Sequence, residues 1–291
     1  MGVFDKDLFG KSKHETAIAR IRAFCEGKRT LVAFSGGKDS QCCYHLCQEA
    51  GIEFTAQYSI TRFEPPELLQ FIRANYPDCV FRMAFKSTLV DQIAANGLPN
   101  RWVRWCCDAK HTKTVGFDIS VIGVRADESP RRAANWRAFG FKQDKTAYIC
   151  PVFEWSTHDV WEYLNARGVP HCCLYDPPYS FRRIGCVCCP LNHTQMLRDA
   201  ELWPKTAEML KMGARKFVER MKAQGYKTAR GGDCAGWCEA PDPVKEYWTR
   251  WIHTGQTTMP VGVLTDDRDE PCLFAGTGFS ESDGAGEADE P

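Results

Sequence analysis

Four cysteines in this sequence have the residue type and spacing of a metal-binding set. Cys106 and Cys107 are adjacent in RWVRWCCDAK, and Cys186 and Cys189 form a C-x-x-C in RRIGCVCCP. Cysteine thiolates bind zinc and iron–sulphur clusters. Zinc sites usually use two C-x-x-C turns, since each turn points both sulphurs at one ion, whereas adjacent cysteines suit the separate iron corners of a larger cluster. The pattern favours an iron–sulphur cluster, with zinc and a metal-free site as alternatives.

A second candidate site is the stretch LVAFSGGKDS, in which an apolar segment runs into two glycines and then a helical pattern. Gly36 and Gly37 let the backbone turn with its N–H groups inward, and the helix N-terminus adds positive potential. Lys38 supplies a point charge, while Ser35 and Ser40 supply hydroxyl donors. The loop is neither a Walker A sequence nor G-x-G-x-x-G. It predicts a phosphate or pyrophosphate site; the alternative is a tight turn with surface polar residues.

Arginines follow the apolar segment DISVIGV at residues 118–124. A guanidinium at Arg125, just past a strand, can hold phosphate or sulphate oxygens in a bidentate fork. Arg131 and Arg132 add positive charge, and Glu128 can orient one of them. The alternative is an exposed loop whose charges are solvated.

Short apolar segments rich in β-branched and aromatic residues alternate with helical patterns along the first half of the chain. Strands alternating with helices predict βαβ units, hence an α/β fold with a doubly wound, mostly parallel sheet. Right-handed crossovers bring the loops at the carboxyl ends of such strands together. The predicted strands are at 30–34, 53–60, 79–85 and 118–124.

The pattern divides the chain into four parts. An N-terminal helical segment occupies residues 1–29, and the domain with the phosphate loop and the cysteine set occupies 30–193. A mainly helical, cysteine-rich C-terminal region is predicted at 194–274. The acidic, glycine-rich tail at 275–291 is predicted to be disordered.

Composition narrows the class of protein. The formal net charge is zero, so no general attraction to nucleic acid or membrane is implied. No stretch is long and apolar enough for a membrane span, and the N-terminus has no signal-peptide pattern, which predicts a cytoplasmic protein. Sixteen cysteines in a reducing compartment indicate metal-binding, catalytic or buried thiols. Six of them are expected to be small core hydrophobes: Cys25, Cys42, Cys43, Cys47, Cys79 and Cys150.

Four stretches together resemble a known family. The sequence SGGKDS after the first strand resembles the PP-loop ATP pyrophosphatases. IGVRADESPRR, PVFEWSTHDVWEYL and LYDPPYSFRRIGCVCCP resemble, in order, three motifs of the phosphoadenosine phosphosulphate (PAPS) reductase family. The resemblance covers residues 31–190. It implies an adenine nucleotide alpha hydrolase-like fold that binds ATP or an adenylyl sulphate, and a 4Fe–4S cluster like that of the adenylyl-sulphate (APS) reductases.

The resemblance also implies roles for individual residues. Lys38, Asp39, Arg125 and Cys188 are the expected catalytic residues, Cys188 as a sulphur carrier or an alternative ligand. The expected cluster ligands are Cys106, Cys107, Cys186 and Cys189. The expected nucleotide-binding residues are Ser35, Gly36, Gly37, Lys38, Asp39, Ser40, Thr61, Glu67, Arg125, Glu128 and Arg132.

One motif departs from the family pattern. The second strand of the family usually ends in D-T-G-x-x-x-P-E, and this chain has ITRFEPPE. Ile60 stands in place of the aspartate and Arg62 in place of the glycine, whereas Thr61 and Glu67 keep their positions. The identity of the nucleotide therefore stays open.

Two reactions fit the resemblance. A sulphurtransferase would adenylylate an acceptor with ATP and release pyrophosphate, with Mg²⁺ neutralising the triphosphate and a cysteine desulphurase as sulphur donor. An APS or PAPS reductase would form sulphite with a thioredoxin-like reductant, using a cysteine in E-C-G-x-H. That motif is absent from this sequence, and the nearest cysteines are Cys234 and Cys238. Its absence favours sulphur transfer.

A third hypothesis is a non-catalytic nucleotide-binding partner in a nucleic-acid modification or defence complex, which the altered ITRFEPPE loop favours. Nine tryptophans, with basic clusters at RWVRW and RRAANWR, offer surfaces on which a nucleic acid can stack. Tryptophans in a hydrophobic core are the commoner explanation. No membrane partner is expected.

Overall fold

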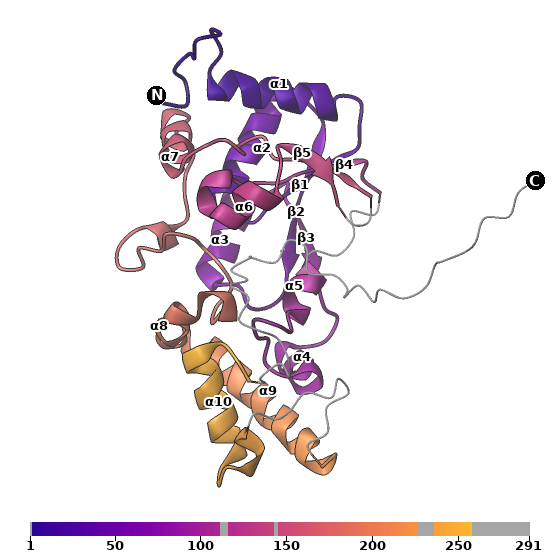
Figure 1. Cartoon of the computed structure of the whole chain (residues 1–291), viewed down its shortest axis with the longest axis vertical. Coiled ribbons are helices and arrows are strands. Elements are labelled where there is room, and N and C mark those ends of the chain that lie inside the picture. Colours follow the sequence, from indigo (N-terminus) through magenta and orange to yellow (C-terminus); the bar gives the residue numbers. More distant parts are fainter. Residues whose placement is uncertain (1, 111–115, 143–144, 226–235, 258–291) are drawn as a thin grey trace, which may run out of the picture.

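The computed structural model describes residues 2–110, 116–142, 145–225 and 236–257. The predicted tail at 275–291 and Cys234 lie outside these residues. In the described part, an α/β domain with a central sheet joins a group of helices from the C-terminal region (Figure 1).

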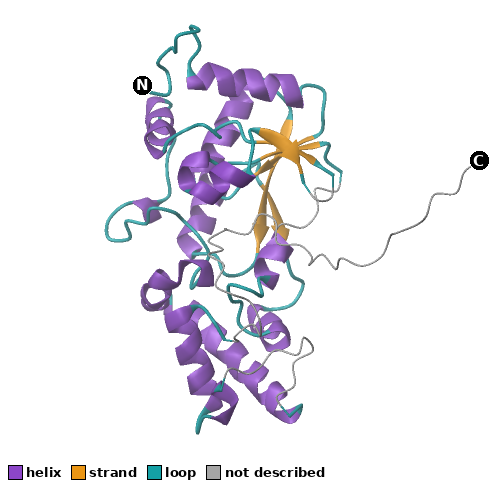
Figure 2. Ribbon diagram, viewed as in Figure 1, coloured by secondary structure: helices purple, strands orange, loops and turns teal. Residues whose placement is uncertain are grey.

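The six-stranded sheet has the order β3-β2-β1-β4-β6-β5. Its strands are drawn in orange in Figure 2. All neighbours pair in parallel except β5 and β6, which are antiparallel. The chain runs outward from β1 to β3 and then returns to β4 on the other side of β1, so the strand order reverses between β1 and β4. Ligands of open α/β sheets bind at such a reversal, beyond the carboxyl ends of the strands. The strands are β1 Thr30–Ala33, β2 Phe54–Ile60, β3 Val80–Met83, β4 Ile119–Val121, β5 Phe139–Phe141 and β6 Ala147–Ile149.

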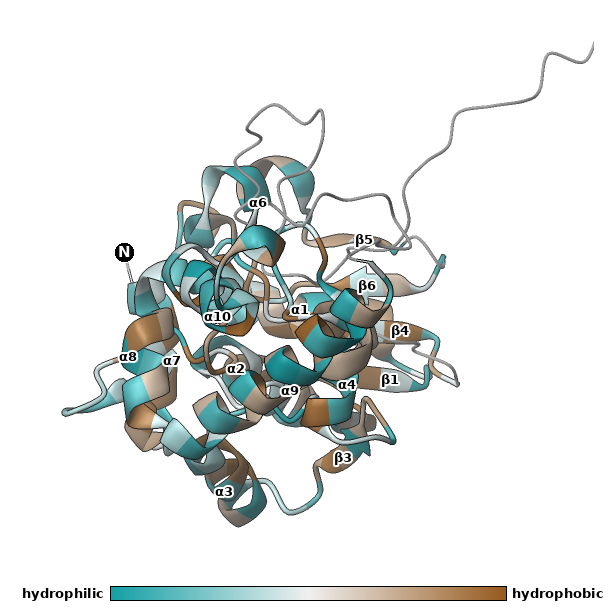
Figure 3. Cartoon of the chain, turned by 90° about the horizontal axis from the view of Figure 1, so that it is seen from below, coloured by the Kyte–Doolittle hydropathy of each residue, from teal (hydrophilic) through white to brown (hydrophobic). Residues whose placement is uncertain are grey.

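Helices of the sheet domain follow the predicted alternation, and the doubly wound α/β fold is confirmed. The central strands are hydrophobic (Figure 3), and Val32, Ile119, Val121 and Ile149 are fully buried. The six cysteines predicted to be core hydrophobes are all buried. The helices are α1 Lys13–Cys25, α2 Lys38–Ala50, α3 Pro66–Asn75, α4 Leu89–Asn96, α5 Trp105–Lys110, α6 Pro130–Asn135 and α7 Thr157–Ala166.

The C-terminal helices α8 Met196–Leu202, α9 Pro204–Ala223 and α10 Pro243–Thr254 lie at the opposite end of the molecule from α1 (Figure 1). Helix α9 packs along α4, and a Cβ atom on Gly213 would lie 2.6 Å from Cβ of Ile93. Glycine at this position lets the two helices approach closely. None of the helices in the described ranges is long and apolar enough to cross a membrane.

Candidate functional site

The phosphate loop joins β1 to α2 and depends on its glycines. Gly36 has φ of +69°, and a Cβ atom there would lie 2.7 Å from Cδ1 of Ile72 on α3. Only glycine satisfies both the backbone angle and the close approach. Gly37 is the N-cap of α2, so the N-terminal N–H groups of a thirteen-residue helix follow directly. This is the local structure that binds phosphate groups.

Ser40 holds the loop in shape. Its Oγ accepts hydrogen bonds from the Ser35 N–H at 3.1 Å and the Ser35 hydroxyl at 3.0 Å. It donates its own proton to the carbonyl oxygen of Gly37 at 2.8 Å. With these three bonds, and with its side chain buried, Ser40 serves the loop conformation, whereas Ser35 is exposed.

Lys38, Asp39 and Arg125 form one ion-pair network. Nζ of Lys38 lies 3.2 Å from Oδ2 of Asp39, and Nε of Arg125 lies 2.6 Å from Oδ1 of the same carboxylate. The Arg125 side chain is only 2 % exposed. Both carboxylate oxygens of Asp39 are therefore bound by cations of the protein, which fixes Lys38 and Arg125 relative to each other.

The rest of the Arg125 guanidinium is also bound inside the protein. Its Nη1 donates to the Trp155 carbonyl oxygen at 3.1 Å, and its Nη2 donates to Oγ1 of Thr157 at 3.2 Å. A Cβ atom on Gly123 would lie 2.9 Å from the carbonyl carbon of Asp39, so this glycine lets the strand end approach α2. These contacts position Arg125 beside Asp39, and its predicted direct fork on phosphate or sulphate remains a prediction.

Glu128 and Arg132 support the same turn. The Glu128 carboxylate accepts the backbone N–H of Arg125 at 3.2 Å and forms an ion pair with Arg132. Arg132 is 4 % exposed. Both residues lie beside Arg125 as predicted from the sequence, but their contacts are within the protein.

The loop after β2 replaces the family's glycine without changing the need for a left-handed residue. Arg62 has φ of +71°, a conformation that glycine adopts most easily. The buried Glu64 stabilises it by accepting bonds from the Thr61 N–H at 2.8 Å, the Thr61 hydroxyl at 2.6 Å and the Arg62 N–H at 2.7 Å. The sequence reasoning did not single out Glu64.

Glu67, at the start of α3, faces the C-terminal half of the chain. Its carboxylate accepts from Nε1 of Trp203 at 2.9 Å and from the Tyr179 hydroxyl at 3.5 Å. These bonds join α3 to two later segments. The predicted nucleotide contact of Glu67 remains a prediction.

The two cysteine pairs both border the loop at 61–64. The Val187 N–H donates to the Phe63 carbonyl oxygen at 2.7 Å, and the nearby Thr61 side chain acts to lower the pKa of the Cys186 thiol. On the other side, the rings of Phe63 and Trp105 have centroids 5.8 Å apart, and Trp105 immediately precedes the adjacent cysteines on α5. Sγ atoms of that adjacent pair are 4.0 Å apart.

Lys110 supplies a positive charge between the pairs. Burial opposes this charge, but Cys186 and Tyr58 raise the pKa of the ammonium group above its ordinary value. Glu64 and Cys107 act in the same direction. Burial also raises the pKa of the Cys186 thiol to about 12, although Lys110 opposes this rise. A cation that favours thiolates is suited to a site where cysteines bind metal.

Four cysteine thiols are a donor set that fits zinc or an iron–sulphur cluster, and the spacing of their sulphurs bears on the choice. All four predicted ligands are cysteines of intermediate exposure. Within the described ranges, no three of their sulphurs lie within 4.8 Å of one another. Zinc with bonds of about 2.3 Å would bring sulphurs to about 3.8 Å. A larger cluster accepts wider spacing.

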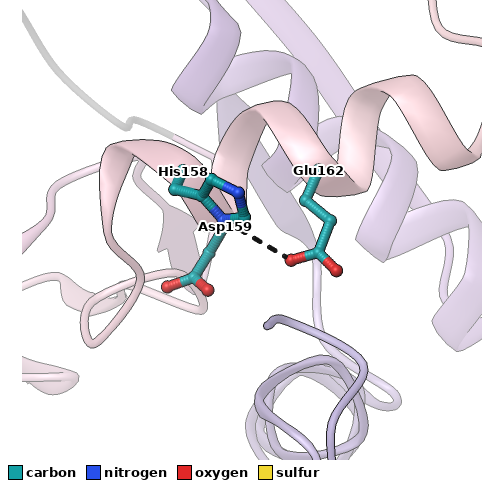
Figure 4. Close-up of side chains that lie close together, drawn as sticks. All are labelled: His158, Asp159 and Glu162. Carbon is teal, nitrogen blue, oxygen red and sulfur yellow. Dashed lines mark ion pairs between the residues drawn. The ribbon is translucent and has the colours of Figure 1, made fainter. Parts of the chain in front are cut away.

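His158, Asp159 and Glu162 on α7 do meet that distance criterion (Figure 4). The two carboxylates, however, have other partners. Asp159 lies 2.5 Å from Nζ of Lys13, and Glu162 accepts the backbone N–H of Val3 at 2.8 Å. His158 is 82 % exposed. Through these contacts, the two carboxylates attach the N-terminal segment to α7.

Cys188 lies in the hydrophobic core. It is fully buried, with φ of +53°, and its Sγ contacts the Met196 carbonyl oxygen at 3.4 Å. Burial raises the pKa of its thiol to about 12. Its N–H donates to Oδ2 of the buried Asp199 at 2.9 Å. Because the thiolate is the reactive form, this environment argues against Cys188 as a sulphur carrier.

Comparisons with known proteins identify the family. The phosphoadenosine phosphosulfate reductase domain matches residues 29–192, more than half of the chain. The chain belongs to this family. It is 29% identical over 213 residues to an uncharacterized protein of Methanocaldococcus jannaschii, covering 66% of this chain and 43% of that protein. It is 27% identical over 134 residues to adenosine 5'-phosphosulfate reductase of Staphylococcus saprophyticus, covering 43% of this chain and 54% of that enzyme.

The chain thus spans about half the length of these two curated relatives. Among solved structures, it is similar to phosphoadenylyl-sulfate reductase from Candida auris in a phosphate complex, with a TM-score of 0.45 and 13% identity. That match covers 59% of this chain and 88% of the other. The family assignment from the sequence motifs is confirmed.

Proposed function

We propose that this member of the PAPS reductase family binds an adenine nucleotide at the loop 35–40 and transfers sulphur to an acceptor that it has first adenylylated. The main support is the return of one segment to both candidate sites. The carbonyl oxygen of Arg182 lies 3.5 Å from Nζ of Lys38, and five residues later the N–H of Val187, next to Cys186, donates to the Phe63 carbonyl oxygen in the loop after β2. The phosphate loop follows β1, and the segment with Cys186 contacts the loop after β2, so both lie beyond the carboxyl ends of neighbouring strands.

The loop has the groups needed to bind a triphosphate. Lys38 and the N-terminal N–H groups of α2 attract phosphate oxygens, and the Asp39–Arg125 ion pair holds the lysine in place. An acceptor oxygen would attack the α-phosphorus of ATP, forming an O–P bond while the bond to pyrophosphate breaks. Positive groups fixed around the leaving pyrophosphate would stabilise its developing charge. Asp39 is already occupied by two cations, so Mg²⁺ would be held chiefly by the phosphates.

Cys106, Cys107, Cys186 and Cys189 would hold a 4Fe–4S cluster. When bound, such a cluster supplies electrons or sulphur chemistry beside the nucleotide. The chain's own contribution is to keep Lys110 near the thiols and to hold the C-x-x-C against Phe63. A cysteine desulphurase is the proposed source of sulphur: its persulphide sulphur would bond to the activated atom of the acceptor as AMP leaves, and a thiol reductant would then cleave the remaining S–S bond.

Reduction of an adenylyl sulphate is the second candidate, and the name of the Staphylococcus saprophyticus relative favours it. It requires a thiol that attacks the sulphate sulphur, and a thioredoxin-type reductant to release sulphite. Apart from the four proposed ligands, Cys173 is the one exposed thiol among the free cysteines of the described residues. The E-C-G-x-H motif is absent from the sequence.

The two reactions have different products. Protein purified without oxygen, with iron and acid-labile sulphide determined, would be given ATP, APS and PAPS in separate reactions. Pyrophosphate from ATP in the presence of a sulphur donor, without sulphite from either adenylyl sulphate, supports sulphur transfer. Sulphite from APS or PAPS with a reductant would refute it in favour of the reductase.

A further inference from the structure

The segment that precedes the C-x-x-C contacts the phosphate loop, and Tyr175 makes this contact. The hydroxyl oxygen of Tyr175 accepts the backbone N–H of Lys38, the first residue of α2, at 2.9 Å. It also lies 3.3 Å from the place where a Cβ atom on Gly37 would be. A tyrosine far from the loop in sequence therefore puts its hydroxyl at the N–H groups where phosphate is expected.

The Tyr175 ring is held firmly in this position. It packs edge-on against Trp161, with ring centroids 5.0 Å apart, and Nζ of Lys38 lies 5.9 Å from its centroid. Burial raises the pKa of the phenol above its ordinary value, so the hydroxyl keeps its proton near neutral pH. In the parts of the chain that the structure describes, the oxygen has a donor, Lys38, but its own proton has no acceptor. Tyr175 is of intermediate exposure, so this proton is accessible to an acceptor on a ligand bound at the loop.

We propose that Tyr175 donates its hydroxyl proton to a phosphate oxygen of the nucleotide bound at the loop 35–40, while its oxygen keeps the Lys38 N–H. This inference rests on the nucleotide site of the proposed function. Tyr175 is then a phosphate-contacting residue. It also links the nucleotide to Cys186, which follows it on the same segment.

In the opposite role, the Tyr175 hydroxyl blocks the phosphate site. In that case the hydroxyl occupies an N–H group that the phosphate needs, and the nucleotide must displace it. The two roles predict opposite effects of removing the hydroxyl. As a donor, Tyr175 strengthens binding, and its loss weakens the complex; as a plug, its loss strengthens the complex.

The test compares the full-length wild-type chain with Tyr175→Phe by titration calorimetry, using ATP, APS, pyrophosphate and adenosine. Loss of one hydrogen bond to a charged oxygen should weaken the binding of the three phosphate-bearing ligands by roughly 10-fold. Adenosine, which has no phosphate, should bind wild type and variant alike. A merely structural role of Tyr175 would weaken adenosine binding as well.

Tyr179→Phe is the matched control, because it removes a hydroxyl from the same segment that contacts Glu67 instead of the loop; it should leave all four affinities unchanged. Tyr175→4-aminophenylalanine retains an N–H donor and should restore binding of the phosphate-bearing ligands. Affinities that stay equal or rise in Tyr175→Phe, with wild type binding normally, would overturn the inference alone. A wild-type chain that binds none of the phosphate-bearing ligands would overturn the nucleotide site itself.

Discussion

Replacing Asp199 by asparagine should flatten the pH dependence of the chain's stability. The Oδ2 atom of Asp199 accepts the N–H of Cys188 in the C-x-x-C, and its buried Oδ1 has no hydrogen-bond partner among the residues that the structure describes. Burial raises the pKa of this carboxyl from 3.8 to about 6, against the opposing effects of the Cys188 hydrogen bond and of Arg198. The folded chain therefore binds this proton more tightly than the unfolded chain.

The difference between the folded and unfolded pKa of Asp199 sets both the sign and the size of its effect on the free energy of unfolding. A folded-state pKa above the unfolded one gives a stabilising contribution that is complete below about pH 4 and is lost as the pH rises through about 6. Two pH units correspond to about 3 kcal/mol of unfolding free energy. Wild type should lose this amount between roughly pH 4 and 7, and Asp199→Asn should not, because an amide does not titrate there.

Urea unfolding of the metal-free protein at several pH values between 4 and 7.5 measures the effect. The informative quantity is the change with pH, since the asparagine also alters the hydrogen bonding at a fixed pH. Glu201→Gln, which removes an exposed carboxylate from the same helix α8, is the control and should follow the wild-type curve. Parallel curves for wild type and Asp199→Asn would refute the reasoning about this buried carboxyl.

Three further changes separate the parts of the site. Cys189→Ser should remove the visible absorption and the iron of anaerobically purified protein, whereas Cys43→Ser, at a buried core cysteine, should leave the iron content unchanged; equal iron in both would contradict the ligand assignment. Lys38→Ala should weaken ATP binding by roughly 10- to 100-fold, since it removes a charged partner of the phosphates, while iron stays bound; calorimetry that finds unaltered affinity would exclude the loop. Gly36→Ala should lower the free energy of unfolding by about 2 kcal/mol or more, because alanine is strained at a positive φ and its Cβ would clash with Ile72; a chemical denaturation midpoint equal to that of wild type would speak against this geometry.

The parts of the fold that local patterns control were predictable. The alternation of apolar strands and helices predicted the sheet, and the glycines after β1 predicted the turn at Gly36, because positive φ has a strong residue preference. The family motifs predicted which residues surround the site. Strands β5 and β6 were not anticipated, since they form an antiparallel pair with no helix between them and so fall outside the strand–helix alternation that predicted the other four strands.

Contacts between distant segments were not predictable. The sequence does not show that Arg125 donates to Trp155 and Thr157, nor that this buried guanidinium also holds Asp39. Likewise, the sequence does not show that Cys188 is buried in the hydrophobic core. Tyr175 lies in one of the family motifs, LYDPPYSFRRIGCVCCP, but its neighbours in the sequence do not predict that its hydroxyl accepts the Lys38 N–H.

The most direct test of the account asks whether the nucleotide loop and the cysteine cluster form one site. Visible absorption and electron paramagnetic resonance spectra of the iron-loaded, dithionite-reduced chain would be recorded before and after saturation with ATP or APS. We predict a change in the spectrum on nucleotide addition that disappears in Lys38→Ala. Iron-loaded protein that binds nucleotide by calorimetry without any spectral change would contradict a shared site, and a chain that retains no iron would contradict the cluster.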